Sequence, residues 1–148
     1  MKEIKEENFK VSLPLQVRFS DIDALGHINN NVYFSYFDLG KVDYFQRVQS
    51  KSIDWLEGVV VLAHLEVDYF SPIYYKEPIV VESKIIRVGT KSGTFLQQIR
   101  NISTNEVKCR CQSVFVTYNP NTQSSMPIPD SWKQAIAEYE GYSFVEKV

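Results

Sequence analysis

The sequence has little cysteine, no long apolar run and almost no excess of one charge. No apolar stretch approaches the length of about 18 residues that a membrane-spanning helix needs, so we expect no transmembrane segment. The formal net charge of -2 gives no basic surplus for binding nucleic acid. The N-terminal residues are mostly charged and lack the apolar core of a signal peptide, so we expect a cytoplasmic protein.

The two cysteines, Cys109 and Cys111, provide no disulfide framework. They lie two positions apart in a predicted strand, where side chains at i and i+2 share a face and splay apart. A metal site would need further ligands, and the only histidines are His27 and His64. We therefore interpret both cysteines as small buried residues and expect no metal centre.

What the chain does contain is an unusual amount of aromatic surface. Of its 148 residues, 44% are hydrophobic and 14% are aromatic, with nine Tyr and nine Phe. This length fits a single domain spanning residues 1–148 with a sizeable core. The aromatic share indicates a large apolar interior or an extensive interface between subunits.

The N-terminal third of the chain reads as a strand, a loop and a long helix. Apolar and polar residues alternate over Val11–Phe19, which predicts a strand with one buried face, and Pro14 places it at a sheet edge. A helix is predicted over Asn31–Val48. Apolar residues cover most of its circumference, so we expect it to be central and largely buried. Gly40 in its middle suggests close approach to a sheet.

Later segments predict an antiparallel sheet. Four strand-like stretches, separated by turn residues, cover Val59–Phe70, Ile79–Val88, Thr94–Ile102 and Val107–Tyr118. Short helices are predicted at Ile53–Leu56 and from Asp130 to a C-cap at Gly141. The order implies an α+β fold, with a sheet of about five strands wrapped round one long helix. Its exposed edges favour dimerisation edge to edge.

The loop Asp21–Asn29 concentrates the polar chemistry. Asp23 lies shortly before the helix, whose first N–H groups lack partners and carry about half a positive charge. Those donors can hold an oxyanion while the carboxylate attacks a carbonyl or activates water, which suits ester or thioester hydrolysis. Helix capping by Asp and Asn explains the same residues equally well, and His27 on its own reads more simply as a structural histidine.

The run Phe19–Tyr33 resembles the signature of hot-dog-fold acyl-CoA thioesterases of the 4-hydroxybenzoyl-CoA thioesterase type. Three further segments are similar to the family's second strand, central hairpin and closing segment; they are Ala63–Pro72, Arg87–Ser92 and Met126–Pro129. The resemblance covers roughly residues 12 to 140. It implies a hot-dog fold and an acyl-CoA thioester hydrolase, with no cofactor because CoA is part of the substrate.

The resemblance also implies catalytic residues. The family's catalytic aspartate is the second acid of the Asp-x-Asp pair, which here is Asp23, acting as general base or nucleophile. His27 would orient water or the loop. Asp21 then becomes an acid that structures the loop.

Substrate-binding residues follow from the same comparison. The amide that polarises the thioester carbonyl comes from the helix start, near Asn30. Asn29 is also expected to bind the substrate, and Tyr33 would line the acyl pocket. Lys91 and Ser92 fall where the family places groups near the CoA phosphates. An ordinary solvated turn explains Lys91 at least as well. The expected partners are the acyl-CoA substrate and a second copy of the chain, in a dimer or a tetramer.

Some positions depart from this pattern. In thioesterases that act on acyl carrier protein, an asparagine stands where this chain has Leu25, yet Asp23 and His27 match them. An acyl-carrier-protein thioesterase is therefore one alternative, and a non-catalytic acyl-CoA binding protein is another. A hot-dog hydratase is disfavoured, because Ala24–Gly26 spaces Asp23 from His27 too widely.

Overall fold

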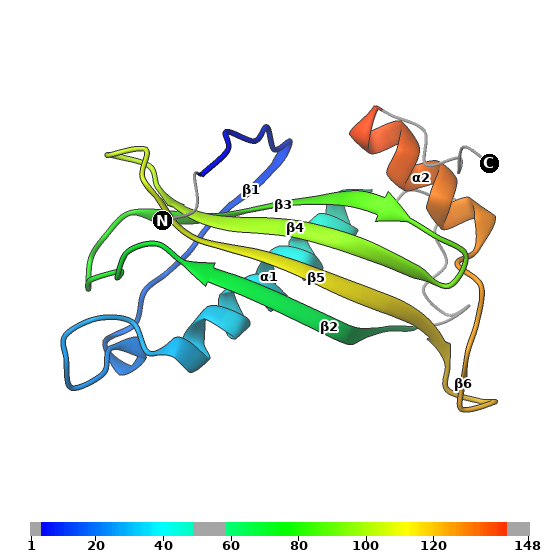
Figure 1. Ribbon diagram of the computed structural model, residues 1–148, viewed down its shortest axis with the longest axis horizontal. Coiled ribbons are helices and arrows are strands. Elements are labelled where there is room, and N and C mark those ends of the chain that lie inside the picture. Colours follow the sequence, from blue (N-terminus) through cyan, green and yellow to red (C-terminus); the bar gives the residue numbers. More distant parts are fainter. Residues whose placement is uncertain (1–3, 49–58, 142–148) are drawn as a thin grey trace.

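The computed structural model describes residues 4–48 and 59–141 and shows one antiparallel sheet with a long helix against one face (Figure 1). That helix, α1, runs from Asn30 to Val48. The sheet contains β1 (Val11–Pro14), β2 (Val59–Tyr69), β3 (Ile79–Val88), β4 (Ser92–Asn101), β5 (Val107–Asn119) and the short β6 (Ser124–Ser125). A second helix, α2 (Asp130–Glu140), lies at one end of the sheet (Figure 1).

The sheet places β2 at an open edge. The strand order is β1-β3-β4-β5-β2, and β6 pairs with the last two residues of β5, Tyr118 and Asn119, on the side of β5 opposite β2. Every pairing is antiparallel. The predicted α+β class and antiparallel sheet are confirmed, and the bounds predicted for β3 are those observed. The helix predicted at Ile53–Leu56 lies outside the described residues.

The first strand is shorter than its alternating pattern predicts. Pairing with β3 ends at Pro14, after which only the Leu15 amide still donates to the Ile79 carbonyl, over 2.9 Å. A short 3-10 helix, η1, then covers Phe19–Asp21. The apolar alternation persists because Leu15 and Val17 pack against the core without being paired in the sheet.

Helix α1 buries only one face in a single chain. Its sheet-facing residues are buried, namely Tyr33, Tyr36, Phe37, Gly40, Tyr44 and Val48. Three large apolar residues on the helix are exposed: Phe34, Leu39 and Val42. The prediction of a largely buried helix is therefore wrong for the isolated chain, because apolar composition does not distinguish a core face from a face that awaits a partner.

Gly40 marks the closest approach of α1 to the sheet. A Cβ atom there would lie 2.8 Å from Gln97 Nε2 and 2.9 Å from Ser83 Oγ, which real Cβ atoms do not tolerate. The same Nε2 donates a hydrogen bond of 2.9 Å to the Phe37 carbonyl of the helix. The predicted reason for this glycine is thus confirmed.

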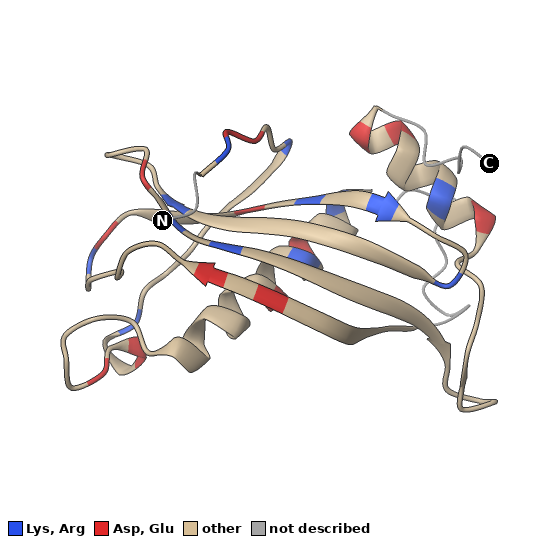
Figure 2. Ribbon diagram, viewed as in Figure 1, with Lys and Arg blue, Asp and Glu red and all other residues tan. Residues whose placement is uncertain are grey.

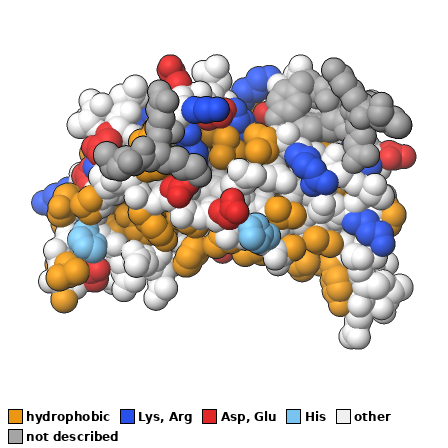
Figure 3. Space-filling view, in the orientation of Figure 1, with side chains coloured by type: hydrophobic (Ala, Val, Ile, Leu, Met, Phe, Trp, Pro, Cys, Tyr) orange, Lys and Arg blue, Asp and Glu red, His pale blue; other side chains and the backbone are white. Residues whose placement is uncertain are grey.

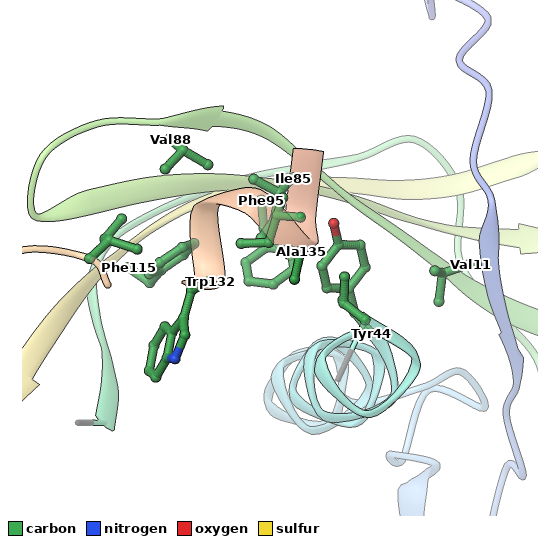
Figure 4. Packing of buried hydrophobic residues seen from close by; sticks show 11 residues of the cluster. Val11, Tyr44, Ile85, Val88, Phe95, Phe115, Trp132 and Ala135 are labelled. Carbon is green, nitrogen blue, oxygen red and sulfur yellow. The ribbon is translucent and has the colours of Figure 1, made fainter. Parts of the chain in front are cut away.

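Two clusters form the core. In the first, Tyr44 of α1 and Trp132 of α2 meet Phe95 and Phe115 from the sheet (Figure 4). The second cluster lies toward the start of α1 and contains both cysteines, which are free thiols with at most 1% of their surface exposed. Gly141 ends α2 with a left-handed φ of 79°, as its predicted C-cap role requires.

The distribution of charge and the lengths of the helices complete the description of the fold. Figure 2 shows acidic and basic residues interspersed along the strands, with no stripe of one sign. Among the helices within residues 4–48 and 59–141, none is both long and apolar enough to cross a bilayer.

Candidate active site

The loop between η1 and α1 folds back on itself. The Asp23 amide donates to the His27 carbonyl over 2.9 Å, and the Gly26 amide donates to the Asp23 carbonyl over 3.1 Å. Gly26 adopts a φ of +87°, a left-handed conformation that favours glycine. The closed loop holds Asp23 and His27 opposite each other.

Asp23 presents an accessible carboxylate beside an imidazole. Its Oδ1 accepts the Leu25 amide hydrogen at 2.9 Å, and its Oδ2 lies 3.5 Å from His27 Nδ1. The side chains of Asp23 and His27 are 27% and 31% exposed. A carboxylate held in this way keeps lone pairs available for a water molecule or a substrate.

Directly after this loop, the start of α1 offers an unused donor. Asn29 is the residue before the helix, and its side-chain oxygen accepts the Asn31 amide hydrogen at 3.1 Å. Its carbonyl accepts the Val32 amide hydrogen at 2.9 Å. Within the part of the chain that the structure describes, the Asn30 amide has no acceptor. The positive end of a 19-residue helix therefore points a free N–H toward solvent.

Asp21 is the opposite of Asp23 in its environment. It is 1% exposed and accepts hydrogen bonds from the Tyr36 hydroxyl (2.8 Å), the Arg18 amide (2.9 Å) and Arg18 Nη2 (3.1 Å). Burial by itself raises the pKa of Asp21, but these donors outweigh it and hold the pKa below its ordinary value. Asp21 is thus a charged, internally satisfied residue of the loop base, as expected for a structuring acid.

A pocket of about 280 Å³ opens next to the helix start. Tyr33 and Tyr69 meet edge to face in its wall, with ring centroids 5.0 Å apart. The other residues that line it are His27, Ile28, Asn30, Phe70, Ser71 and Pro72. An apolar pocket that reaches both His27 and Asn30 is suited to an acyl group whose carbonyl lies at the helix end.

Comparisons with known proteins agree with this geometry. A profile of the thioesterase-like superfamily matches residues 17–136. The chain belongs to this superfamily. It is similar to a thioesterase from Thermus thermophilus solved with coenzyme A and Zn, at 33% identity and a TM-score of 0.80, over 92% of this chain and 98% of that one.

Two further comparisons extend this family assignment. A predicted thioesterase from Bacillus stearothermophilus has a TM-score of 0.76 and 28% identity, covering 86% of this chain and 93% of that one. The uncharacterized protein YsmA of Bacillus subtilis (strain 168) is 31% identical over 80 residues. That match covers 54% of each chain, so it spans about half the length of this curated relative. The structural matches confirm the expected hot-dog fold.

In this thioesterase-like chain, Lys108 holds the pocket residues Phe70, Ser71 and Pro72 in place. Its carbonyl accepts the amide hydrogens of Phe70 and Ser71, and its ammonium donates to the Pro72 carbonyl over 3.3 Å. Burial lowers the pKa of Lys108, but Glu77 at 3.0 Å and Glu106 at 3.2 Å raise it above its ordinary value. The lysine therefore remains charged and forms an ion pair with each of the two carboxylates.

The sequence pattern did not identify the part of the pocket formed by Phe70, Ser71 and Pro72. Ser71 and Pro72 were recognisable only as the end of a strand, because their contacts depend on a lysine 36 residues from Pro72 along the chain. The neighbouring segment also ties down the loop, since the Ile28 amide donates to the Ile73 carbonyl over 2.8 Å. These contacts join segments that are far apart in the sequence, so they become apparent only in the folded chain.

Lys91 and Ser92 lie elsewhere in the same chain. Ser92 pairs with Val116, at the end of the sheet where β3 finishes, whereas the loop joins the end where β3 begins at Ile79. Ten residues of strand separate these ends by about 30 Å. The structure thus brings Asp23, His27, Asn29, Asn30 and Tyr33 together and leaves the hairpin apart.

Proposed function

We propose that this protein hydrolyses acyl-CoA thioesters, releasing a carboxylic acid and free CoA. The observation that carries the proposal is the accessible Asp23 carboxylate set just before the unpaired Asn30 amide of a long helix. The similarity to a thioesterase solved with coenzyme A, over nearly all of both chains, supports CoA as the carrier.

The reaction follows from these two groups. The thioester carbonyl oxygen accepts the Asn30 N–H, and the helix end stabilises the negative charge that develops on it. Asp23 either takes a proton from the water that attacks the carbonyl carbon or attacks that carbon itself. The C–S bond then breaks, and the thiolate of CoA leaves without needing a strong general acid. When Asp23 acts as the base, it returns the proton to the products and is regenerated. When it acts as the nucleophile, the acyl group is left on Asp23 as a mixed anhydride, and water then hydrolyses this anhydride, which releases the carboxylic acid and regenerates the carboxylate.

His27 has an orienting role in this scheme. Its Nδ1 lies 3.5 Å from Asp23 Oδ2 and 3.4 Å from the Ile28 carbonyl oxygen. A ring between these two oxygens can carry a proton on Nδ1 and present its other nitrogen toward the pocket that it lines. Tyr33 and Tyr69 form the apolar wall that receives the acyl group.

The active form is proposed to be a homodimer joined through β2. This edge strand has 11 residues, and a long unpaired edge invites pairing with another chain. Large apolar residues are exposed along β2 and on α1: Val59, Val61, Leu62, Tyr69, Phe34, Leu39 and Val42. Figure 3 shows hydrophobic side chains along the margin of the molecule formed by β2.

Such a dimer would bring Lys91 of one subunit toward the Asp23 loop of the other. A twofold axis that pairs β2 with its own copy in antiparallel fashion sets the Val59 end of one strand beside the Tyr69 end of the other. The hairpin with Lys91 and Ser92 lies toward the Val59 end, since Val59 pairs with Tyr118 and Ser92 with Val116 on the same strand. The partner's lysine could then serve the CoA phosphates as a point charge.

The test is thiol release from short, long and aromatic acyl-CoAs by the wild-type chain and by Asp23→Ala. We expect turnover of at least one ester by the wild type and loss of turnover in the variant. Asp130→Ala, which alters an aspartate at the start of α2, is the matched control and should leave turnover unchanged. Near wild-type turnover in Asp23→Ala would refute the assignment.

Two additions to this experiment separate the alternatives: an acyl group bound to acyl carrier protein as a substrate, and a measurement of acyl-CoA binding. An acyl-carrier-protein thioesterase would hydrolyse the carrier-bound acyl group faster than the CoA ester of equal length. A binding protein would retain acyl-CoA tightly and release no thiol.

A further inference from the structure

The tip of the loop before α1 is unsupported by packing. A Cβ atom added at Gly26 would meet nothing within 4 Å, and Leu25 is 78% exposed. Hydrogen bonds within the loop fix the shape of its tip, so the position of Asp23 relative to the helix depends on how the base of the loop is attached.

Asp21 fixes that base to the helix at two points. Its carbonyl accepts the amide hydrogen of Asn29, the residue before α1, over 2.9 Å. Its carboxylate accepts the hydroxyl hydrogen of Tyr36, which is the seventh residue of the helix, over 2.8 Å. Both Asp21 and Tyr36 are at most 3% exposed, so water competes little for this bond.

The two attachments together determine how the loop meets the helix end. Asp23 lies two residues after Asp21, and Asn30 lies one residue after Asn29. The Ile28–Ile73 bond attaches the loop to a neighbouring segment rather than to the helix. Without the Tyr36 bond, Asp21 would be held to the helix start by the Asn29 bond alone, and the separation between the Asp23 carboxylate and the Asn30 amide could change. Tyr36 supplies the second point from within the body of the helix.

We propose that Tyr36 and Asp21 are positioning residues that set the distance between the Asp23 carboxylate and the Asn30 amide. This inference rests on the proposed thioesterase activity. Neither residue needs to touch the substrate. Their loss misplaces Asp23 and lowers kcat while substrate binding by the pocket is retained.

The chain contains its own control for a purely structural effect. Tyr44, on the same face of α1, is 0% exposed and donates its hydroxyl to Glu140 Oε1 over 3.1 Å. This pair joins the other end of the helix to α2, far from the loop (Figure 1). Tyr44→Phe thus removes a buried tyrosine–carboxylate bond from the same helix without touching the loop base.

The experiment compares Tyr36→Phe with Tyr44→Phe. We expect Tyr36→Phe to lower kcat by about tenfold to 100-fold, with KM changed less than about threefold, because a small misplacement of a reacting group has an effect of this size. Tyr44→Phe should keep kcat within about twofold of the wild type, although both variants lower the melting temperature. Equal kcat values for the two variants would overturn the proposal.

Amide hydrogen exchange provides a readout that does not need activity. Residues 22–31 should exchange faster in Tyr36→Phe than in Tyr44→Phe, measured by mass spectrometry on the intact chain. Unchanged exchange in Tyr36→Phe would overturn the proposal even in an active enzyme. If the wild type releases no thiol from any acyl-CoA, the proposed function fails, and the exchange result alone then decides whether Tyr36 anchors the loop.

Discussion

Asp21 and Asp23, only two positions apart, have different environments and different proposed roles. Asp21 is buried and has three hydrogen-bond donors, whereas Asp23 is partly exposed and receives one amide hydrogen bond and a nearby imidazole. Residue type alone does not separate them. The Asp-x-Asp spacing in the sequence indicated which was which only through its resemblance to a known signature, and the contact of Asp21 with Tyr36 could not be foreseen from local sequence.

Asp21 should make stability depend on acid pH. Its pKa in the folded chain lies below the ordinary value of 3.8, so its stabilising effect is complete above that pH and is lost as the pH falls through the folded-state pKa. We expect Asp21→Asn to lower the free energy of unfolding by about 1–3 kcal/mol at pH 7. Urea unfolding should show this difference shrinking below pH 3.8. A difference that stayed constant down to about pH 2 would contradict this account.

The thiols of Cys109 and Cys111 should be unreactive in the folded protein. Burial raises the pKa of Cys111 to about 11 and raises that of Cys109 still further. At about pH 8, a thiol reagent should therefore label neither cysteine in the native chain and both after denaturation. Rapid native labelling of either would show that the second core cluster is more open than described.

At the scale of elements, periodicity and turn residues predicted most of the fold. The long helix, the four later strands and the C-terminal helix all appear close to their predicted bounds. Patterns of burial were less reliable guides. The alternation over Val11–Phe19 continues past the last residue that pairs with β3, because later residues of this segment still pack against the core. The apolar residues of α1 include some on a face that the single chain leaves exposed. Both errors arise because side-chain hydrophobicity does not specify what covers it.

The close approach of Gly40 to the sheet allows a test of how near α1 lies to the sheet. Gly40→Ala should lower the free energy of unfolding by about 1–3 kcal/mol, despite the better helix propensity of alanine, because the new methyl group overpacks against Gln97 and Ser83. Ser35→Ala, at an exposed position of the same helix, should change it by less than about 0.5 kcal/mol. Chemical denaturation of both variants provides the comparison. A stabilised Gly40→Ala would mean that the helix lies farther from the sheet.

At the scale of the whole molecule, residues 4–48 and 59–141 of one chain leave the outer edge of β2 without a pairing strand and part of an aromatic-rich helix uncovered. The aromatic excess in the sequence anticipated either a core or an interface, and the exposed apolar residues on α1 and β2 favour the second. The proposed dimer accounts for both surfaces with one twofold axis.

Light scattering after size-exclusion chromatography should reveal this assembly. The wild type is expected at about twice the chain mass of 17.2 kDa. Leu62→Lys, at an exposed position of β2, should shift it toward the mass of a single chain. Ile102→Lys, which alters a residue of similar exposure away from β2, should remain dimeric. A monomeric wild type, or a dimeric Leu62→Lys, would contradict the proposed interface.

The most direct measurement is the ratio of kcat values for the wild type and Asp23→Asn on whichever acyl-CoA the wild type hydrolyses fastest. Asparagine preserves the shape and the bond to the Leu25 amide but cannot take a proton or attack a carbonyl. A carboxylate that acts as base or nucleophile predicts a fall in kcat of at least about 100-fold. If Asp23→Asn turns over within a few-fold of the wild type, Asp23 does not carry the reaction.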